Sequence, residues 1–464
     1  MTTTNSSAVE EKEDKLTVKM SLQHIRVAVI GNVDAGKSTL IGTLKTGRLD
    51  DGRGQSRQTI MKHNHEIETG RTSTITSHLI GYNEDGHSVG FDQNSATTSQ
   101  MKSDYEIASE ATQLVSLVDL AGHEKYLKST IHGISSGMID YALVLINANH
   151  PPNHMTCHHI GLSIASGIPI IIVLTKIDNC PKHALKNTKD EIANILRCPG
   201  VQKKTFQIKQ ASDISLIKDK MHALTPLVSI SSVSGEGLHL LHDLLNALPK
   251  RRCHQNKAGR TLEYLVEDTF NITGVGVVVS GFVNAGRSRV GDTVFVGPMS
   301  DKSFIKTRIK SIHIARTNVS SVMAGNSACL GLALSKDQRN LLRRGMVVLE
   351  TPLETTQVFE AEIVIIKGSG VDGTTIKVGY ETMAHILHVR QHVKIEHINV
   401  LGNEMCKSSF DEHSATIRPG HRAKVTFRFL QRPEFIRTGM KMLFRDGHIR
   451  GVGIVTKLKT IYSK

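Results

Sequence analysis

The stretch Gly31-Asn-Val-Asp-Ala-Gly-Lys-Ser38 decides the fold of the first half of this chain, because it matches the pattern GxxxxGK[ST]. It follows the apolar run Arg26–Ile30, which predicts a strand, and it opens the helical pattern Lys37–Leu44. In such a loop the backbone N–H groups wrap phosphate oxygens, the lysine reaches the terminal phosphates and the serine hydroxyl is a ligand for Mg²⁺. The predicted phosphate-binding residues are Gly31, Asn32, Val33, Asp34, Ala35, Gly36, Lys37, Ser38 and Thr39.

A second loop, Asp119-Leu-Ala-Gly122-His123, follows the apolar run Leu114–Val118. An aspartate at a strand end can hold Mg²⁺ through water, and the N–H of a nearby glycine can sense the last phosphate of a nucleotide. The DxxG pattern is weak alone, but its place after the phosphate loop favours a nucleotide-dependent switch. His123 then lies where a side chain that orients water is needed, although a loop histidine without a task remains the alternative.

Two further loops predict which base is bound. The loop Thr175–Asp178 ends the apolar run Pro169–Leu174, and its aspartate can accept hydrogen bonds from guanine N1 and N2, which adenine does not offer. The loop Ser231–Val233 follows the run Leu227–Ile230, where a tight turn can present an N–H to guanine O6. Ligands of open α/β sheets bind at this edge, so the four loops in this order predict a guanine nucleotide. The predicted base-binding residues are Thr175, Lys176, Asp178, Ser231, Ser232 and Val233.

At 464 residues the chain is long enough for about three domains. Residues 23–252 alternate apolar runs with helical patterns, which predicts a GTP-binding α/β domain with a parallel sheet covered on both faces. Short apolar runs punctuated by glycine then predict two all-β barrels, at 253–353 and 354–464. We expect residues 1–22 to be a disordered tail, and the polar segments Gly81–Ala111 and Val201–Lys220 to be mostly loop.

Composition and charge narrow the class of partner. The six cysteines are at least 18 residues apart, which excludes a CxxC zinc knuckle and favours a reducing compartment. No apolar run approaches the ~18 residues of a membrane span. The net charge is +14, and 12 basic against two acidic residues between Arg418 and Lys464 give that segment +10. This localised field favours a polyanionic partner, most simply RNA, over a merely solubilising surface.

With these motifs in this order, the chain resembles the translational GTPases related to elongation factor Tu. The barrel segments Gly274–Gly281 and Val452–Thr456 carry the likeness as well as the phosphate loop does. Within that superfamily the chain is most similar to the GTP-binding protein 1 and 2 group, on the residues Leu49–Gly54, His65–Ser73 and Asp119–Lys128. One departure from the wider superfamily is Thr175, where most members carry asparagine; the protein 1 and 2 group is similar in having threonine there.

The resemblance implies roles for three residues and a set of partners. Thr72 would be a switch I ligand for Mg²⁺ beside Ser38, His123 the catalytic residue, and Val33 a hydrophobic gate. The implied activity is GTP hydrolysis with GTP, GDP and Mg²⁺, by a cytoplasmic monomer that binds aminoacyl-tRNA or other RNA and acts on the ribosome. Two alternatives stay open. One is a GTP-dependent adaptor for mRNA decay by the RNA exosome, and the other is a metabolic GTPase of the sulfate-activating type, against which the basic third domain argues.

Overall fold

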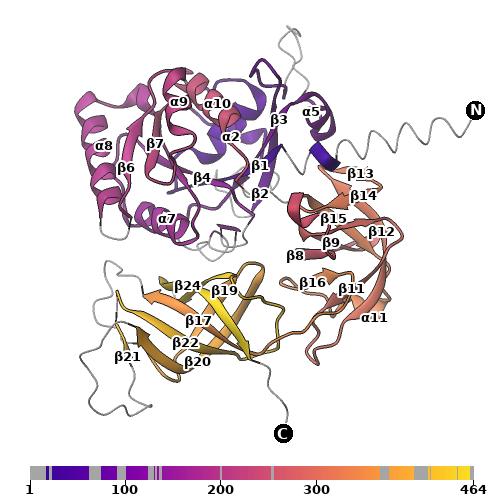
Figure 1. Ribbon diagram of the computed structural model, residues 1–464. Coiled ribbons are helices and arrows are strands. Elements are labelled where there is room, and N and C mark those ends of the chain that lie inside the picture. The colour runs from indigo at the N-terminus through magenta and orange to yellow at the C-terminus, as the bar shows by residue number, and fades with distance from the viewer. Residues whose placement is uncertain are drawn as a thin grey trace, which may run out of the picture.

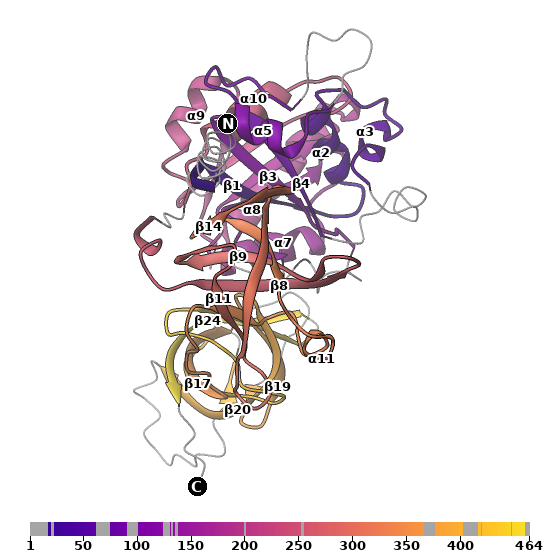
Figure 2. The same cartoon turned by 90° about the vertical axis from the view of Figure 1, so that its right-hand side faces the viewer.

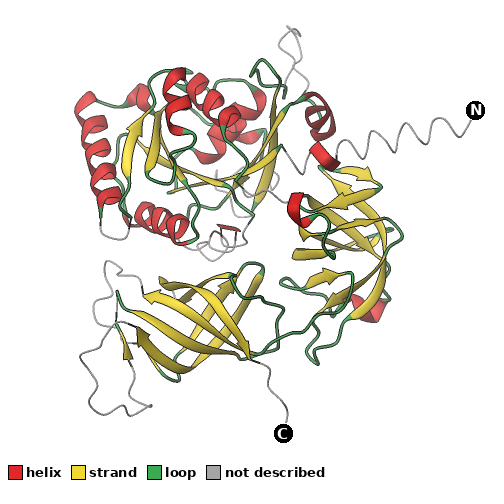
Figure 3. Cartoon of the chain, viewed as in Figure 1, coloured by secondary structure: helices red, strands yellow, loops and turns green. Residues whose placement is uncertain are grey.

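The computed structural model describes residues 17–19, 23–61, 75–90, 101–123, 130, 133–134, 138–198, 201–251, 255–365, 376–401, 416–418, 420–446 and 448–459. An α/β unit is followed by two β-barrels. In Figure 1 the α/β unit lies at the upper left, the first barrel at the right and the second barrel below. Helices are concentrated in the first unit, whereas the other two consist mainly of strands (Figure 3). The predicted fold class is therefore confirmed.

The α/β unit is built on a seven-stranded sheet with the order β2-β3-β1-β4-β5-β7-β6. All neighbouring strands are parallel except β2, which runs antiparallel to β3 at the edge of the sheet. The expectation of a wholly parallel sheet was therefore wrong at this edge. The strands are β1 (His24–Gly31), β2 (Thr76–Tyr82), β3 (Gln113–Asp119), β4 (Tyr141–Asn147), β5 (Ile170–Thr175), β6 (Lys204–Gln207) and β7 (Leu224–Ser229).

Helices cover both faces of this sheet, as predicted. Because successive side chains of a strand point to opposite faces, Val27 and Val29 of β1 pack with one set of helices and Ala28 and Ile30 with the other. The first set is α2 (Lys37–Thr46), α9 (Ala211–Ile217) and α10 (Leu238–Ala247), and the second is α7 (His154–Ala165) and α8 (Lys182–Arg197). None of the described helices is long and apolar enough to cross a membrane.

Two segments that were predicted to be mostly loop contain regular structure. Within 81–111 lies α5 (Asp104–Glu110), which begins with a capping box between Ser103 and Glu106. Within 201–220 lie β6 and α9, and α9 buries Ile214 and Ile217 against the sheet. The loop predictions were wrong there because α5 and α9 each bury only two apolar residues and β6 buries none, too few for a periodic pattern, so these elements depend on contacts with the rest of the molecule.

The first barrel is a sheet with the order β11-β16-β8-β9-β15-β12-β13, which closes because β11 also pairs with β12. A separate ribbon pairs β10 with β14, and the short helices η3 and α11 lie in the connections. The elements are η3 (Gln255–Lys257), β8 (Glu263–Ile272), β9 (Gly276–Ala285), β10 (Arg287–Arg289), β11 (Thr293–Gly297), β12 (Ile305–Ile314), β13 (Thr317–Val319), β14 (Ser321–Met323), β15 (Ser327–Leu332), α11 (Lys336–Arg339) and β16 (Val347–Leu349).

The second barrel is closed, with the order β17-β22-β20-β19-β23-β24 and a final pairing of β24 with β17. Its interior is filled by aromatic residues, among them Phe359, Phe427 and Phe444. The strands are β17 (Val358–Ile365), β18 (Ile376–Lys377), β19 (Glu381–Ile386), β20 (Val389–Leu401), β21 (Thr416–Ile417), β22 (Arg422–Phe429), β23 (Lys441–Asp446) and β24 (His448–Lys459). The predicted domain limit at residue 354 falls in the connection between β16 and β17, and residue 253 lies outside the described residues.

The two barrels are joined by ion pairs of two buried carboxylates. Glu434, which is 1% exposed, accepts hydrogen bonds from Arg343 Nη2 of the first barrel (2.9 Å) and from Gln391 Nε2 of the second (2.7 Å). Glu263 of the first barrel is also buried and lies 2.8 Å from Arg437 Nη2 of the second. Both carboxylates are therefore compensated across the interface, which fixes one barrel against the other.

Contacts between the α/β unit and the barrels include hydrogen bonds to neutral groups, apolar packing and an ion pair of Asp104 with the exposed Arg316 (3.7 Å). Arg26 of β1 donates a 2.6 Å hydrogen bond to Ser327 Oγ of the first barrel, and Lys441 of the second barrel donates to the Ser166 carbonyl oxygen (3.2 Å). Leu443 of the second barrel joins the apolar cluster beneath α7 and α8. Figure 2 shows the α/β unit and the second barrel at opposite ends of the molecule, with the first barrel beside both.

The described residues of the N-terminal segment also touch the first barrel. Residues 17–19 form a helical turn, and Thr17 is buried with its carbonyl oxygen accepting a 3.0 Å hydrogen bond from Asn326 Nδ2. The expectation of a disordered tail over 1–22 was thus wrong at these three residues, because a buried amide partner holds them. Residues 1–16 and 20–22 lie outside the described part of the chain.

We predict that Arg343→Ala lowers the melting temperature markedly, because removal of one partner from a buried ion pair costs about 3–5 kcal/mol. The pKa of Glu434 is raised by burial, and Arg343, Gln391 and Arg432 oppose this shift. Loss of Arg343 raises the pKa further, so the stability deficit should be larger at pH 7.5 than at pH 5, where Glu434 can take up a proton. The measurement is thermal unfolding of both proteins at the two pH values.

Arg344→Ala is the matched control. Arg344 is the next residue along the chain, but it is 66% exposed and pairs with Asp268 of its own barrel. Loss of an exposed pair costs about 0–1 kcal/mol. Equal deficits in the two variants would show that the buried pair does not stabilise the arrangement of the barrels.

Candidate functional site

The four motif loops meet at one edge of the α/β sheet. They follow the carboxyl ends of β1, β3, β5 and β7. Strand β1 pairs with β3 on one side and with β4 on the other, while β5 pairs with both β4 and β7. Since these strands are parallel, their carboxyl ends lie on the same edge, and loops that are far apart in the sequence become neighbours.

The phosphate loop is held together from inside by Lys37. Its ammonium group is buried and donates hydrogen bonds to the carbonyl oxygens of Gly31 (3.1 Å) and Asn32 (2.9 Å). Burial lowers the pKa of Lys37, and the negative charges of Asp119 and Asp34 oppose that shift. The loop therefore carries a desolvated cation at the amino end of α2, an arrangement suited to phosphate oxygens.

Ser38 and Asp119 lie together at the ends of α2 and β3. The Ser38 hydroxyl donates a 2.8 Å hydrogen bond to Asp119 Oδ2, and Asp119 is 1% exposed. A hydroxyl and a carboxylate are the hard oxygen ligands that Mg²⁺ prefers, so this pair fits the ion. Ser38 and Asp119 would hold it beside the phosphates, whose negative charge it would neutralise. Thr72, the other predicted ligand, lies outside the described residues.

The loop after β3 is pressed against the phosphate loop. A Cβ atom on Gly122 would collide with Lys37 Nζ and would lie 2.5 Å from the Gly31 carbonyl oxygen, so only glycine fits this position without a shift. His123 follows directly and lines a cavity of about 100 Å³ over the phosphate loop. The cavity is lined by Val33, Asp34, Gly36, Lys37, Ser38, Thr39, Arg57, Gly122, His123 and Lys176.

The loop after β5 is tied to the phosphate loop through Thr175. Its buried hydroxyl donates a 2.9 Å hydrogen bond to the carbonyl oxygen of Ala35. Lys176 has a positive φ of 59°, a conformation that turns the chain sharply and brings this residue to the cavity wall. Asp178 is exposed in the short helix η2 (Ile177–Asn179), outside the lining of that cavity.

The loop after β7 is a tight turn organised by Ser231. Its buried hydroxyl oxygen accepts hydrogen bonds from the N–H groups of Val233 (3.2 Å) and Ser234 (3.0 Å). The Ile177 N–H also reaches the carbonyl oxygen of Ile230 (3.4 Å), which joins this turn to the loop after β5. The predicted base-binding residues are thus neighbours, although Ser231, Ser232 and Val233 do not line the small phosphate cavity.

Sequence reasoning missed a further loop that reaches the site. The Asp50 carboxylate is buried and accepts hydrogen bonds from the N–H groups of Gly52, Gly54 and Ser56, at 2.9–3.1 Å. The Asp50 N–H itself donates to the carbonyl oxygen of Ser232 (2.8 Å). One carboxylate therefore folds the loop and fastens it to the turn after β7. The adjacent Asp and Gly residues were a recognisable turn signal, but they did not reveal the partner.

Arg57 is the residue that this folded loop delivers to the cavity. It lies in the short helix α3 (Gln55–Gln58), which packs so closely on α2 that a Cβ atom on Gly42 would collide with the Ser56 carbonyl. Gly54 has a φ of 92°, and a Cβ atom there would come within 2.6 Å of Arg57 Nε. No local pattern in the sequence singles out Arg57, because its position depends on the Asp50 hydrogen bonds and on α2.

Comparisons with known sequences match the same units of the chain to known protein families. The family described as elongation factor Tu GTP binding domain matches residues 22–250, and elongation factor Tu domain 2 matches residues 276–349. GTP-binding protein 2 from Homo sapiens is 36% identical over 445 residues, which cover 94% of this chain and 70% of that protein. GTP-binding protein 1 from Xenopus laevis is 34% identical over 438 residues, covering 94% of this chain and 63% of that protein.

Solved structures share the fold at lower identity. A bacterial selenocysteine-specific elongation factor EF-Sec matches with a TM-score of 0.63 and 19% identity, covering 93% of this chain and 58% of its own. Elongation factor SelB from Methanococcus maripaludis, in complex with the GTP analogue GppNHp, matches with a TM-score of 0.63 and 19% identity, covering 95% of this chain and 80% of its own. Taken with the sequence relatives, these findings establish that the chain belongs to the elongation factor Tu family of translational GTPases, whose GTPase domains bind GTP and GDP with Mg²⁺ and hydrolyse GTP.

Proposed function

We propose that this GTPase is a cytoplasmic, monomeric factor that binds aminoacyl-tRNA or another RNA and acts on the ribosome, in elongation or in rescue of stalled ribosomes. GTP would favour the RNA-bound state, and hydrolysis would release it. The observation that carries the RNA part of the proposal is a cationic outer face on the second barrel.

That face is formed by β22, by its neighbours β17 and β20, and by β24, which pairs with the other side of β17. In register, Lys394 lies opposite Arg428, Glu362 opposite Lys424, and Glu360 opposite Lys457. The cations of this face are Lys394, Arg422, Lys424, Arg428, Lys457 and Lys459. Three glutamates pair with some of them: Glu362 with Arg422, Glu396 with Arg428 and Glu360 with Lys459. The face keeps a net positive charge, a field that favours a phosphate backbone.

The residues of the nucleotide cavity would have different roles in GTP hydrolysis. Lys37 and the backbone N–H groups of its loop would bind the phosphates, and His123 would orient the attacking water once the ribosome has positioned it. Arg57, on the cavity wall, would place a guanidinium against the negative charge that develops on the last phosphate. Asp178 and the turn around Ser231 would select guanine. Thr72 would be a ligand for Mg²⁺ in the GTP state, and it lies outside the described residues.

The ribosome proposal predicts that purified ribosomes stimulate GTP hydrolysis, and that aminoacyl-tRNA changes this stimulation. His123→Ala should bind GTP within about twofold of the wild type but lose stimulated turnover by about 100-fold, since positioned proton-transfer groups contribute 10²–10⁴ in rate. The measurement is phosphate release at fixed salt with no addition, with ribosomes, and with ribosomes plus tRNA.

Each outcome decides between candidate functions. Stimulation in the wild type but not in His123→Ala supports both the factor and the histidine's role. Stimulation that is equal in both proteins removes the histidine from catalysis. GTP binding with no stimulation by ribosomes contradicts the proposal and favours the adaptor for mRNA decay, which recovery of exosome subunits without ribosomes would support.

Arg57→Ala should reduce turnover by about 100-fold, the usual loss when one donor to developing charge is removed. The ground-state affinity for GDP should change little, because that charge is absent before reaction. Arg53→Ala is the control, since Arg53 lies in the same loop and is exposed, yet it does not line the cavity. If both variants turn over like the wild type, Arg57 has no part in the chemistry.

The cationic face predicts the salt dependence of tRNA binding. Lys394→Gln, Lys424→Gln and Lys457→Gln together should reduce the slope of log K against log[salt] by roughly 2–3, at about 0.7–0.9 per lost phosphate contact. A matched triple variant in the α/β unit removes the same charge, through the exposed residues Lys182, Lys186 and Lys209. Similar slopes for the two triple variants would count against the barrel face as the RNA surface.

A further inference from the structure

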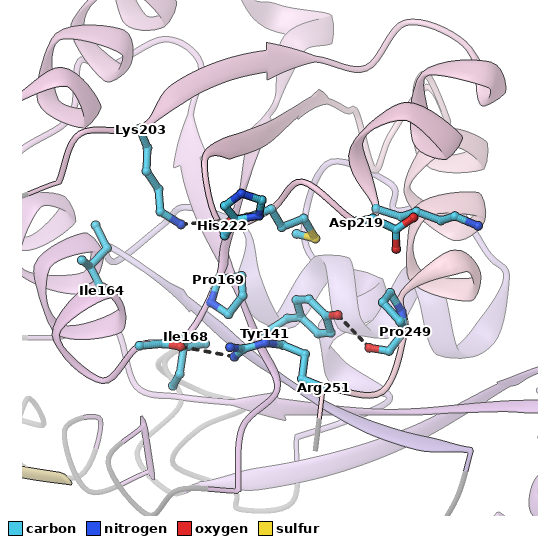
Figure 4. A pocket seen from close by; sticks show the side chains of 12 residues that line it. Tyr141, Ile164, Ile168, Pro169, Lys203, Asp219, His222, Pro249 and Arg251 are labelled. Carbon is cyan, nitrogen blue, oxygen red and sulfur yellow. Dashed lines mark hydrogen bonds between the residues drawn. The ribbon is translucent and has the colours of Figure 1, made fainter. Parts of the chain in front are cut away.

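A second cavity lies at the amino ends of the strands of the α/β sheet, whereas the nucleotide loops lie at their carboxyl ends (Figure 4). Its volume is about 440 Å³, within the range of small-molecule sites. It is formed at the amino ends of four neighbouring strands, where Tyr141 begins β4, Pro169 precedes β5, Lys203 precedes β6 and Met221 comes shortly before β7. The length of the strands, about 20 Å for six residues at 3.3 Å each, separates it from the phosphate loop.

The floor of this cavity is apolar and rigid. It consists of Tyr141, Ile164, Ile168, Pro169 and Met221, and three of these, Tyr141, Ile168 and Met221, are almost fully buried. The Tyr141 hydroxyl donates a 2.7 Å hydrogen bond to the Pro249 carbonyl oxygen, which fixes the ring. Such a floor suits an aromatic or aliphatic group, because burial of its apolar surface is favourable.

The rim is cationic. Lys203, Lys218, His222 and Arg251 line it together with a single carboxylate, Asp219. In the described part of the chain, no carboxylate lies within ion-pair distance of the two lysines or Arg251. In Figure 4, Pro169 lies between Lys203 and His222 on one side and Arg251 on the other, so cationic groups flank the apolar floor on two sides.

Two of the rim cations, Lys203 and Arg251, are fixed in place by hydrogen bonds to backbone carbonyl oxygens. Lys203 donates a 3.1 Å hydrogen bond to the Met221 carbonyl oxygen, and Arg251 donates to the carbonyl oxygens of Asp140 (3.2 Å) and Gly167 (3.3 Å). Partial burial lowers the pKa of Lys203, and the positive charge of Arg251 lowers it further. The two cations therefore repel each other across the cavity, and a ligand with negative charge between them would relieve that repulsion.

We propose that this cavity binds a small organic phosphate, with the phosphate monoester between Lys203 and Arg251 and its apolar body on the floor of Tyr141, Pro169 and Met221. A phosphate offers three strong acceptor oxygens, enough to serve an ammonium and a guanidinium that come from different segments. Lys218 and His222 at the mouth add attraction for the same anion. The site is separate from the proposed action on the ribosome and does not depend on it.

The test is a titration of the full-length chain, saturated with GDP and Mg²⁺ so that the nucleotide site is filled. The probe is phenyl phosphate, and the readout is the methyl NMR signals of Ile164, Ile168 and Met221, with Ile41 of α2 as a distant reference. We expect saturable shifts of the three cavity methyls and none of Ile41. Inorganic phosphate, which lacks the ring, and phenol, which lacks the charge, should each bind at least tenfold more weakly.

Three variants keep the test decisive. Lys218→Glu changes an exposed rim residue and should weaken phenyl phosphate binding at least tenfold, whereas Lys209→Glu, exposed on the same stretch but outside the cavity, should leave it within twofold. Lys203→Gln should also weaken binding. Methyl signals outside the cavity that match those of the wild type would show that this variant is folded. Shifts without saturation, equal affinity in the Lys218 and Lys209 variants, or equal binding of phenol would each overturn the proposal.

Discussion

The candidate nucleotide site depends on the strand order of the α/β sheet. Because β1, β3, β5 and β7 are parallel and lie within a few positions of one another, the loops after them meet at one edge. The tight fits at this edge follow from that order: Gly122 has no room for a side chain beside Lys37, and Thr175 reaches the Ala35 carbonyl oxygen. A strand inserted between β1 and β3 would separate Asp119 from Ser38, and their hydrogen bond would be lost.

Internal hydrogen bonds satisfy the buried charged groups of the site. A buried ammonium group is costly unless it is hydrogen-bonded, and Lys37 meets this requirement with two carbonyl oxygens of its own loop. Ser38 and Asp119 satisfy each other in the same way. A bound phosphate or Mg²⁺ would replace these internal hydrogen bonds. When the nucleotide leaves, the same hydrogen bonds would form again, so no buried charge would be left without a partner.

The sequence predicted the features that are local and missed those that are not. The phosphate loop and the loop after β5 were recognisable because residue type and spacing are themselves the requirement, as in Gly31–Ser38. Arg57 was missed because it reaches the cavity only through the Asp50 hydrogen bonds and the contact of α3 with α2. The segment 201–220 was predicted as loop because α9 gains its stability from burying Ile214 and Ile217 on the sheet, a contact that no window of sequence contains.

The contacts between the units of the chain are also non-local and could not be predicted from the sequence. The charge on Glu434 and Glu263 looks like ordinary surface charge in the sequence, yet both carboxylates are buried and compensated by arginines of the other barrel. Among the described polar contacts of the α/β unit with the barrels, Arg26 reaches a serine hydroxyl and Lys441 a backbone carbonyl, and the ion pair of Asp104 with Arg316 uses an arginine that is 72% exposed. Separating the two barrels would leave buried carboxylates without their partners, whereas shifting both together against the α/β unit would expose apolar residues that the units share, among them Ile107 and Leu443. Compensation of buried charge therefore holds the barrels to each other, and apolar packing holds them to the α/β unit.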